Sequence, residues 1–217
     1  MQDRVGAVKQ MSVFSVVCVA SVILAGGVAY LSKPLGTAFV ILWMLWGIVL
    51  ALGRRSGSTS IHEARQRPIL VISGTLSFSA IILAPWEHMN YGGPLPREGP
   101  FPWIGILIFV LAIGLQWWAL RELGPLYTSR LGIQEGHRLV TSGPYGLVRH
   151  PGYLSGILAI TGIALSMGSL LASVASIGSL LLVIWRIVGE EEMLLEAFGD
   201  FYRDYQRKTW KLIPLIY

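Results

Sequence analysis

The sequence predicts an all-α protein, a polytopic membrane helix bundle with about six transmembrane helices. Of its 217 residues, 53% are hydrophobic and only 13% are charged, whereas a soluble domain carries about 25% charged residues. Long apolar stretches recur along the chain, and a helix needs about 20 such residues to cross a bilayer. A chain of this length has no room for a sizeable soluble domain, so we expect a single membrane domain over residues 1–217.

Five apolar stretches define the expected spans. They are Met11–Leu31, Leu35–Leu52, Ile69–Ala84, Pro102–Leu120 and Leu154–Trp185. The first is too long for a signal peptide, and another span follows it at once, so we expect it in the mature protein. The last has 32 residues, too many for one crossing, and Ser166–Ser169 offers a turn near its middle. We therefore predict a tight helical hairpin and six spans in all. Gly152 and Gly156, a small-xxx-small pair, predict close helix packing.

The distribution of basic residues sets the expected orientation. With both termini in the cytoplasm, 15 of the 17 Lys and Arg residues fall on the cytoplasmic side, and only Lys33 and Arg97 fall outside. This asymmetry follows the positive-inside rule. The cytoplasmic residues are Arg4, Lys9, Arg54, Arg55, Arg65, Arg67, Arg121, Arg130, Arg138, Arg149, Arg186, Arg203, Arg207, Lys208 and Lys211. Because topology accounts for the basic residues, we expect no nucleic-acid partner.

Several other chemistries lack support in the sequence. The histidines at 62, 88, 137 and 150 show none of the short spacings of metal ligands, so we expect no metal. Cys18 is the only cysteine and cannot form an intrachain disulfide. Glu87 and His88 follow the third apolar stretch, and we interpret them as interfacial residues at the outer surface.

The first chemistry-bearing segment lies just before the predicted hairpin. Gly143-Pro144 imposes a turn, and Pro151 suits the first turn of a helix. Tyr145, His150 and Tyr153 therefore gather, with Arg149, where the chain enters the membrane. Free backbone N–H groups at a helix start suit a carboxylate or a phosphate.

The second segment lies at the far end of the hairpin. Arg186 and Glu190 are four residues apart, so they share a helix face. Glu190, Glu191 and Glu192 repel one another, and we expect at least one of them to meet a cation. A hairpin of antiparallel helices returns its ends to one side, which brings this segment close to His150 and Tyr153.

At these residues the chain resembles the isoprenylcysteine carboxyl methyltransferases and the related phospholipid methyltransferases. The matching strings are Leu139–Tyr153 (LVTSGPYGLVRHPGY), Arg186 with Glu190-Glu191, Phe198–Tyr205 and Leu212–Pro214. They cover about Gln134–Pro214, while residues 1–120 carry no recognisable motif. The resemblance implies that residues 121–217 form the cofactor-binding catalytic half, with a cytoplasmic carboxyl-terminal cap and a lipid tunnel between helices.

The resemblance also implies a cofactor, S-adenosylmethionine, and an active site at the cytoplasmic face. Arg186 would bind the methyl acceptor, and Arg186, Glu190 and His150 are the expected catalytic residues. The implied cofactor-binding residues are Gln134, His137, Arg138, Leu139, Val140, Tyr145, His150, Pro151, Gly152, Tyr153 and Glu190. A carboxylate acceptor needs no strong base, whereas an amine or a thiol must lose a proton, for which His150 or a glutamate is the candidate.

These residues leave the acceptor open. The nearest resemblance predicts carboxyl methylation of a prenylcysteine-like acceptor in a membrane. A phospholipid N-methyltransferase and a methyltransferase of small thiols are close alternatives, and an NADPH-dependent membrane reductase of the sterol type is a distant one. Pro144 and Pro151 argue against the reductase, and the absence of ionisable residues in the middle of the spans argues against a transporter.

Overall fold

The structure, a computed structural model, describes residues 20, 33–53, 61–91, 96, 98–124 and 139–216. Within these ranges the chain forms helices and no β-strand beyond one isolated bridge, so the all-α prediction is confirmed there. The elements are α3 (Pro34–Gly53), α4 (Ile61–Asn90), α5 (Phe101–Leu123), η2 (Gly143–Gly146), α6 (Pro151–Met167), α7 (Leu170–Phe198) and α8 (Asp200–Lys208). The first expected span, Met11–Leu31, lies outside the described residues apart from Ala20.

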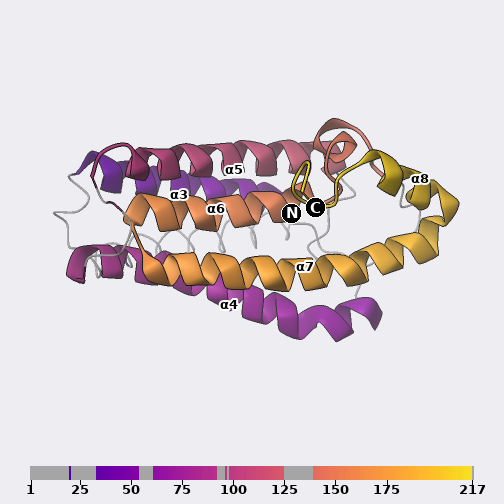
Figure 1. Ribbon diagram of the computed structural model, residues 1–217, viewed down its shortest axis with the longest axis horizontal. Helices are drawn as coiled ribbons and strands as arrows, with labels where there is room; N and C mark the ends of the chain where they lie inside the picture. Colours follow the sequence, from indigo (N-terminus) through magenta and orange to yellow (C-terminus); the bar gives the residue numbers. More distant parts are fainter. Residues whose placement is uncertain are drawn as a thin grey trace, which may run out of the picture.

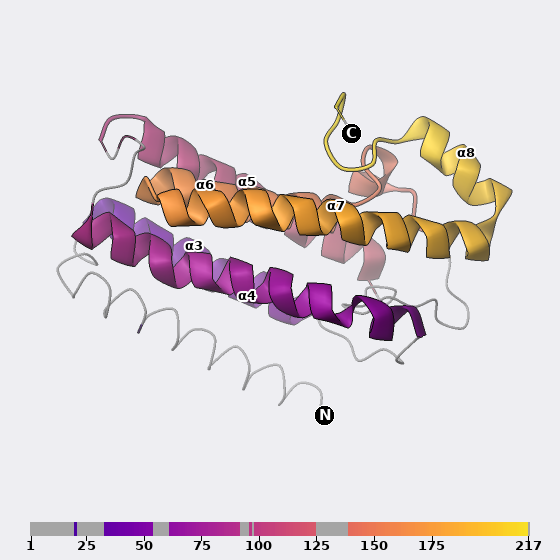
Figure 2. The ribbon, with the colours of Figure 1, turned by 60° about the horizontal axis from the view of Figure 1, so that its bottom comes forward.

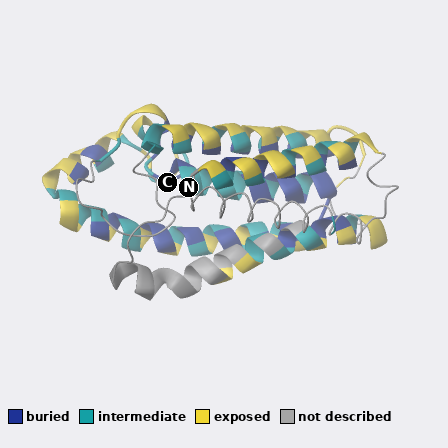
Figure 3. Cartoon of the chain, turned by 180° about the vertical axis from the view of Figure 1, so that it is seen from behind, coloured by how far each residue is buried: buried dark blue, intermediate teal, exposed yellow. Residues whose placement is uncertain are grey.

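Three described helices are long and apolar enough to cross a membrane: α3, over Pro34–Leu52, α5 and α7. The shorter α6 is also apolar, and α4 contains the predicted stretch Ile69–Ala84 and extends beyond both its ends. The helices lie lengthwise beside one another (Figure 1). Their outward faces are exposed (Figure 3), with apolar side chains such as Leu111 and Ile177 about 60% accessible. Such a surface suits lipid, and the protein is an integral membrane protein.

The predicted hairpin is formed by α6 and α7, which turn at the predicted place. Gly168 ends α6 with φ of 61°, a left-handed conformation that glycine adopts without steric cost. Ser169 then caps α7, because its hydroxyl accepts a hydrogen bond from the Ala172 N–H at 3.0 Å. Two consecutive residues thus stop one helix and start the next.

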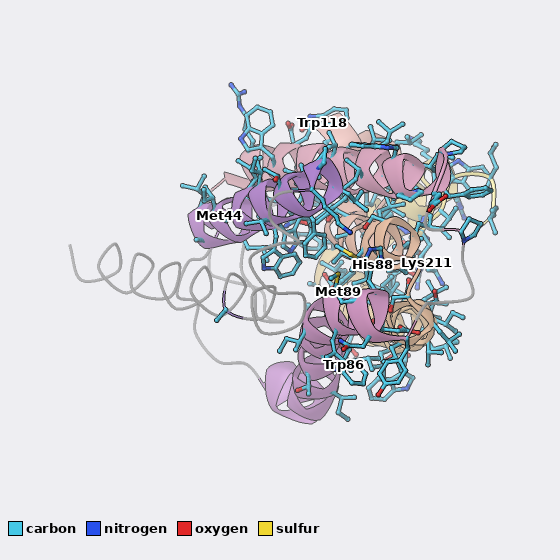
Figure 4. The ribbon with its side chains drawn as sticks, turned by 90° about the vertical axis from the view of Figure 1, so that its left-hand side faces the viewer. Met44, Trp86, His88, Met89, Trp118 and Lys211 are labelled. Carbon is cyan, nitrogen blue, oxygen red and sulfur yellow. The ribbon has the colours of Figure 1, made fainter. Side chains whose placement is uncertain are left out.

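Glu87 and His88 lie against the hairpin turn, and their expected place at a membrane interface stays a prediction. Glu87 is only 8% exposed, and its carboxylate accepts hydrogen bonds from the Ser169 hydroxyl and from the N–H groups of Leu170 and Leu171. His88 Nδ1 lies 2.7 Å from the Met167 carbonyl oxygen, and Figure 4 shows His88 between α4 and the hairpin. Because unsatisfied N–H groups and a partial positive charge gather at a helix start, a carboxylate from α4 stabilises the turn.

Close packing between α5 and α6 depends on a different glycine from the predicted pair. A Cβ atom on Gly162 would lie 2.8 Å from the Gly105 carbonyl oxygen and 2.9 Å from the Phe109 nitrogen. No described atom lies within 4 Å of a Cβ atom built on Gly156, so close packing at that position stays a prediction. The backbones of α5 and α6 therefore touch nearer to the hairpin turn, as small residues allow in membranes.

The other end of the hairpin carries the carboxyl-terminal segment. The chain turns at Gly199 into α8 and then runs back over residues 209–216 (Figure 2). Trp210 pairs with the segment before α6: the Arg149 N–H donates to the Trp210 carbonyl at 2.8 Å, and the Trp210 N–H donates to the Leu147 carbonyl at 3.0 Å. The tail thus lies against the turn that leads into α6.

Candidate active site

The turn of η2 is held by the end of α5. Gly143 has φ of 57°, and a Cβ atom there would lie 2.8 Å from Glu122 Oε2, so both its conformation and its surroundings favour glycine. The Ser142 hydroxyl donates a hydrogen bond to the same Glu122 carboxylate. Pro144 is buried, and Tyr145 follows it. Local geometry and α5 together fix where the Tyr145 backbone lies.

His150 and Pro151 open α6 as the sequence predicts, with His150 at the N-cap and Pro151 as the first helical residue. His150 is 5% exposed, and its Nε2 has no hydrogen-bond partner among the described residues. The nearest acid is Glu191, whose Oε1 lies 3.5 Å from that nitrogen. The imidazole therefore has a free position at the start of a helix, where the N–H groups of the first turn also lack intrahelical partners.

The hairpin brings Tyr153, Arg186 and Glu190 together, as expected from its topology. The Tyr153 hydroxyl donates to Glu190 Oε2 at 2.7 Å and accepts from Arg186 Nε at 2.5 Å. Arg186 also lies over the Tyr153 ring at 5.8 Å. Arg186 and Glu190 thus connect through the Tyr153 hydroxyl, and their side chains do not form a simple surface pair.

One nitrogen of Arg186 has no partner in the part of the chain that the structure describes. The residue is only 5% exposed, and its Nη1 makes no hydrogen bond within the described part of the chain. A buried cation with an unsatisfied donor is costly unless an anion completes it. This nitrogen is therefore a candidate contact for a negatively charged group.

Among the described residues, Glu191 is the acid with the most cationic neighbours, and sequence reasoning gave it no role of its own. Its carboxylate lies 2.6 Å from Arg149 Nε and 3.6 Å from Lys211 Nζ, besides the contact with His150. The expectation that one of three adjacent acids meets a cation is confirmed. Only the folded structure distinguishes Glu191 from its neighbours, because its partner Arg149 is 42 residues away in the chain.

Two tyrosines of α8 close the side of the site nearest the tail. The Tyr205 hydroxyl donates to the Tyr145 carbonyl oxygen at 2.6 Å. Burial raises the pKa of Tyr205 to about 12 and also raises that of Tyr202. Both hydroxyls therefore stay protonated around neutral pH, and Tyr205 remains a donor that ties α8 to the turn.

The remaining predicted residues fall into two groups. Leu139 and Val140 lie half-buried on the segment that enters η2, and Gly152 lies in the first turn of α6. Gln134, His137 and Arg138 lie outside the described residues.

Next to Gly152, sequence reasoning missed Gln116, a buried polar residue of α5. A Cβ atom on Gly152 would lie 3.9 Å from Gln116 Oε1, and that oxygen accepts from the buried Ser155 hydroxyl. A polar residue in an apolar helix was the available signal.

The chemistry of this cluster suits an organic ligand better than a metal ion. Among the described residues, no group of three or more His, Cys, Asp or Glu side chains could hold a metal. The site instead presents one carboxylate at Glu190, one incompletely paired guanidinium at Arg186 and a helix start at His150. These groups can receive a molecule that carries both a positive and a negative charge.

The part of the chain that is similar to a known protein family contains most of the residues of this site. Residues 103–196 match the model of the isoprenylcysteine carboxyl methyltransferase family, which covers α5, η2, α6 and most of α7. A probable protein-S-isoprenylcysteine O-methyltransferase of Oryza sativa subsp. indica is 28% identical over 147 residues, which are 63% of this chain and 75% of that protein. The protein-S-isoprenylcysteine O-methyltransferase of Schizosaccharomyces pombe is 36% identical over 85 residues, 37% of this chain and 34% of that protein.

A solved structure shares the fold. The eukaryotic intramembrane Ras methyltransferase, an isoprenylcysteine carboxyl methyltransferase, aligns with a TM-score of 0.57 and 22% identity, over 90% of this chain and 73% of that one. The membrane fold and the family resemblance predicted from the carboxyl-terminal motifs are confirmed.

Proposed function

Because residues 103–196 of this chain match the model of the isoprenylcysteine carboxyl methyltransferase family, we propose that the protein is an integral membrane methyltransferase that uses S-adenosylmethionine. Its substrate is a lipophilic acceptor, and a carboxylate on a prenylcysteine-like molecule is the form that the site suits best. The observation that carries the proposal is the buried Arg186, beside Tyr153 and Glu190, with a guanidinium nitrogen that lacks a partner among the described residues.

The residues present fit the cofactor. Its ammonium and sulfonium charges suit the Glu190 carboxylate, and its carboxylate suits the N–H groups at the start of α6. We therefore assign cofactor binding to Tyr145, Tyr153 and Glu190, with the residues between His150 and Tyr153. Leu139, Val140, Gln134, His137 and Arg138 complete the proposed set. When bound, the cofactor supplies an already activated methyl group.

Arg186 orients the acceptor. Its Nε is engaged by Tyr153, and its buried Nη1, which has no hydrogen-bond partner among the described residues, can donate to a carboxylate oxygen. A carboxylate held in this way would have no proton to lose on methylation, so the chain would need to supply no base. Holding the reacting atoms in line can lower the activation free energy by at most about 7–11 kcal/mol. The chain thus contributes mainly position and charge.

An amine or a thiol is the alternative acceptor. Either would have to lose a proton, and His150 could take it because its buried Nε2 has no hydrogen-bond partner among the described residues. Phospholipid N-methylation and thiol S-methylation are therefore the alternative activities proposed for the same site.

The site belongs at the cytoplasmic face, in a bundle of six spans with both termini in the cytoplasm. Aromatic side chains sit near both ends of α5, Trp103 at one end and Trp117 and Trp118 at the other, each about half exposed. Trp118 points outward from the bundle in Figure 4. At 1.5 Å per residue the two sets are about 22 Å apart, somewhat less than a hydrocarbon thickness of about 30 Å, and tryptophan is enriched at both membrane interfaces. Arg121 stacks over Trp117 at the end that holds η2, and α8 with the tail forms the cap.

The test is transfer of labelled methyl from S-adenosylmethionine by the purified protein in lipid. A farnesylcysteine analogue, phosphatidylethanolamine and an alkyl thiol would be offered separately, with Glu190→Gln as the cofactor-site control. Base-labile label on the farnesylcysteine analogue would support carboxyl methylation, and stable label on lipid or thiol would support the alternative. Transfer to none of them, together with no binding of the cofactor, would exclude the methyltransferase.

A further inference from the structure

A single guanidinium joins three segments at the mouth of the site. Arg149 precedes α6, and its side chain is 8% exposed. Its Nε donates to Glu191 of α7 at 2.6 Å, and its Nη1 donates to the carbonyl oxygens of Gln206, at 3.0 Å, and of Thr209. The turn before α6, the helix α7 and the carboxyl-terminal tail therefore meet at one side chain.

Glu191 anchors this junction from the side of α7. Its carboxylate is 10% exposed. Besides Arg149 it faces two tail side chains: Gln206, whose Nε2 donates at 3.4 Å, and Lys211, whose Nζ lies 3.6 Å away. Its neighbour Glu192 has the same chemistry but is exposed. Burial of a carboxylate is costly without partners, so its position depends on the tail being docked, and the tail depends on Glu191.

The junction lies directly behind the residues that face the cofactor in the proposed function. The backbone of Arg149 pairs with Trp210, Tyr205 of α8 donates to the Tyr145 carbonyl, and His150 lies 3.5 Å from Glu191. None of the hydrogen bonds or ion pairs of Glu191 is made with Tyr153 or Arg186. Glu191 thus contacts the turn and the tail, and it makes no hydrogen bond or ion pair with Arg186, the proposed acceptor-binding residue.

We propose that Glu191 is a positioning residue that, through Arg149, latches the carboxyl-terminal tail (residues 206–211) over the turn that carries Tyr145 and His150. The inference rests on the proposed function and deepens it: the latch retains the cofactor, whereas Arg186 orients the acceptor. Loss of the latch weakens cofactor binding and frees the tail, and it affects the transfer step much less. This effect separates Glu191 from Glu190, which is expected to contact the cofactor directly.

The test compares Glu191→Gln with Glu192→Gln as a matched control from the same helix. Three quantities are measured on the full-length protein in lipid: hydrogen exchange of the Arg149 and Trp210 amides, the Kd for S-adenosylmethionine, and kcat and KM for that cofactor. We expect Glu191→Gln to speed exchange at both amides about tenfold or more, since a charge-assisted hydrogen bond is lost. We expect Kd and KM for the cofactor to rise about tenfold, with a much smaller fall in kcat. The control stays at the wild-type values.

A second variant keeps the proposal testable should Glu191→Gln fold poorly. Tyr205→Phe preserves the ring in its buried place and removes only the hydrogen bond to the Tyr145 carbonyl. We expect faster exchange at Trp210 and a higher cofactor KM, in the same direction and smaller in size. Glu191→Asp keeps the charge and should show a smaller loss than Glu191→Gln.

Two outcomes would overturn the latch. In one, a folded Glu191→Gln exchanges its Arg149 and Trp210 amides at the wild-type rate. In the other, it loses kcat while the cofactor KM is unchanged, which would make Glu191 a catalytic residue. Failure of the proposed function looks different: the wild type itself neither binds the cofactor nor transfers methyl, and amide exchange alone then decides whether Glu191 holds the tail.

Discussion

Replacing Arg186 by lysine tests the acceptor site most directly. Lysine keeps the positive charge but cannot reproduce the two separate donors of the guanidinium, Nε to Tyr153 and Nη1 to the acceptor. One hydrogen bond to a charged group contributes about 1.5–3 kcal/mol. Losing the one to the acceptor should therefore lower kcat/KM roughly tenfold to 150-fold.

The assay is methyl transfer to a farnesylcysteine analogue in liposomes, with the acceptor varied at saturating S-adenosylmethionine. We expect the loss in kcat/KM for the acceptor, with the Kd of the cofactor near the wild-type value, because Glu190 still accepts from Tyr153. Arg203→Lys is the control, since Arg203 is 59% exposed and pairs only with Asp200 among the described residues.

Two results would refute the reasoning. Wild-type kcat/KM for the acceptor in Arg186→Lys would show that the free nitrogen does not meet the carboxylate. A large rise in the cofactor Kd with no effect specific to the acceptor would place Arg186 on the cofactor side of the site. Alanine at 186 separates these cases further, because it removes both donors and leaves Tyr153 paired to Glu190 alone.

Three further substitutions have defined outcomes. Glu190→Gln should raise the cofactor Kd about tenfold or more, because a neutral amide cannot neutralise the ammonium and sulfonium charges; isothermal titration checks this, and an unchanged Kd would contradict it. Glu87→Gln should lower the free energy of unfolding by about 0.5–2 kcal/mol, since the charge near the start of α7 is lost. The Kd of Glu87→Gln for the cofactor should be unchanged. Thermal unfolding in detergent measures the loss of stability, and a binding titration measures the Kd. Gly162→Ala should destabilise by about 1–3 kcal/mol, because its Cβ would meet the Gly105 oxygen and the Phe109 nitrogen; Gly156→Ala, with open space, is the control.

The sequence predicted the hairpin and its ends because these features are local. A 32-residue apolar stretch must turn somewhere, and Gly168 with Ser169 supplies both a left-handed helix end and a helix cap. Pro151 marks the first turn of α6 for a similar reason, since proline lacks the N–H group that a first turn leaves unpaired. Once the hairpin is placed, Tyr153 and Arg186 lie at similar distances along the chain from its turn, and Glu190 follows Arg186 by one helical turn on the same face, so the three residues meet.

The features that the sequence did not reveal depend on contacts between distant segments. Glu87 caps a helix that begins more than 80 residues later in the chain, and no local pattern connects the two. Gly156 and Gly162 are both small residues of α6, and only the path of α5 decides which one needs to be small. Gln116 is visible as a polar residue in an apolar helix, but its position beside Gly152 depends on how α5 and α6 cross.

The two adjacent glutamates of α7 show how one helix can serve two networks. Successive residues on a helix point about 100° apart, so Glu190 faces Tyr153 and Arg186 while Glu191 faces Arg149 and the tail. The imidazole of His150 lies between them, 3.5 Å from Glu191 and with its ring 5.7 Å from that of Tyr153. His150 therefore contacts both the residue that holds the tail and a residue of the proposed cofactor site. A substitution at Glu191 should therefore weaken cofactor binding even though Glu191 does not contact the cofactor. For this reason the two acids differ in role although their side chains are chemically identical.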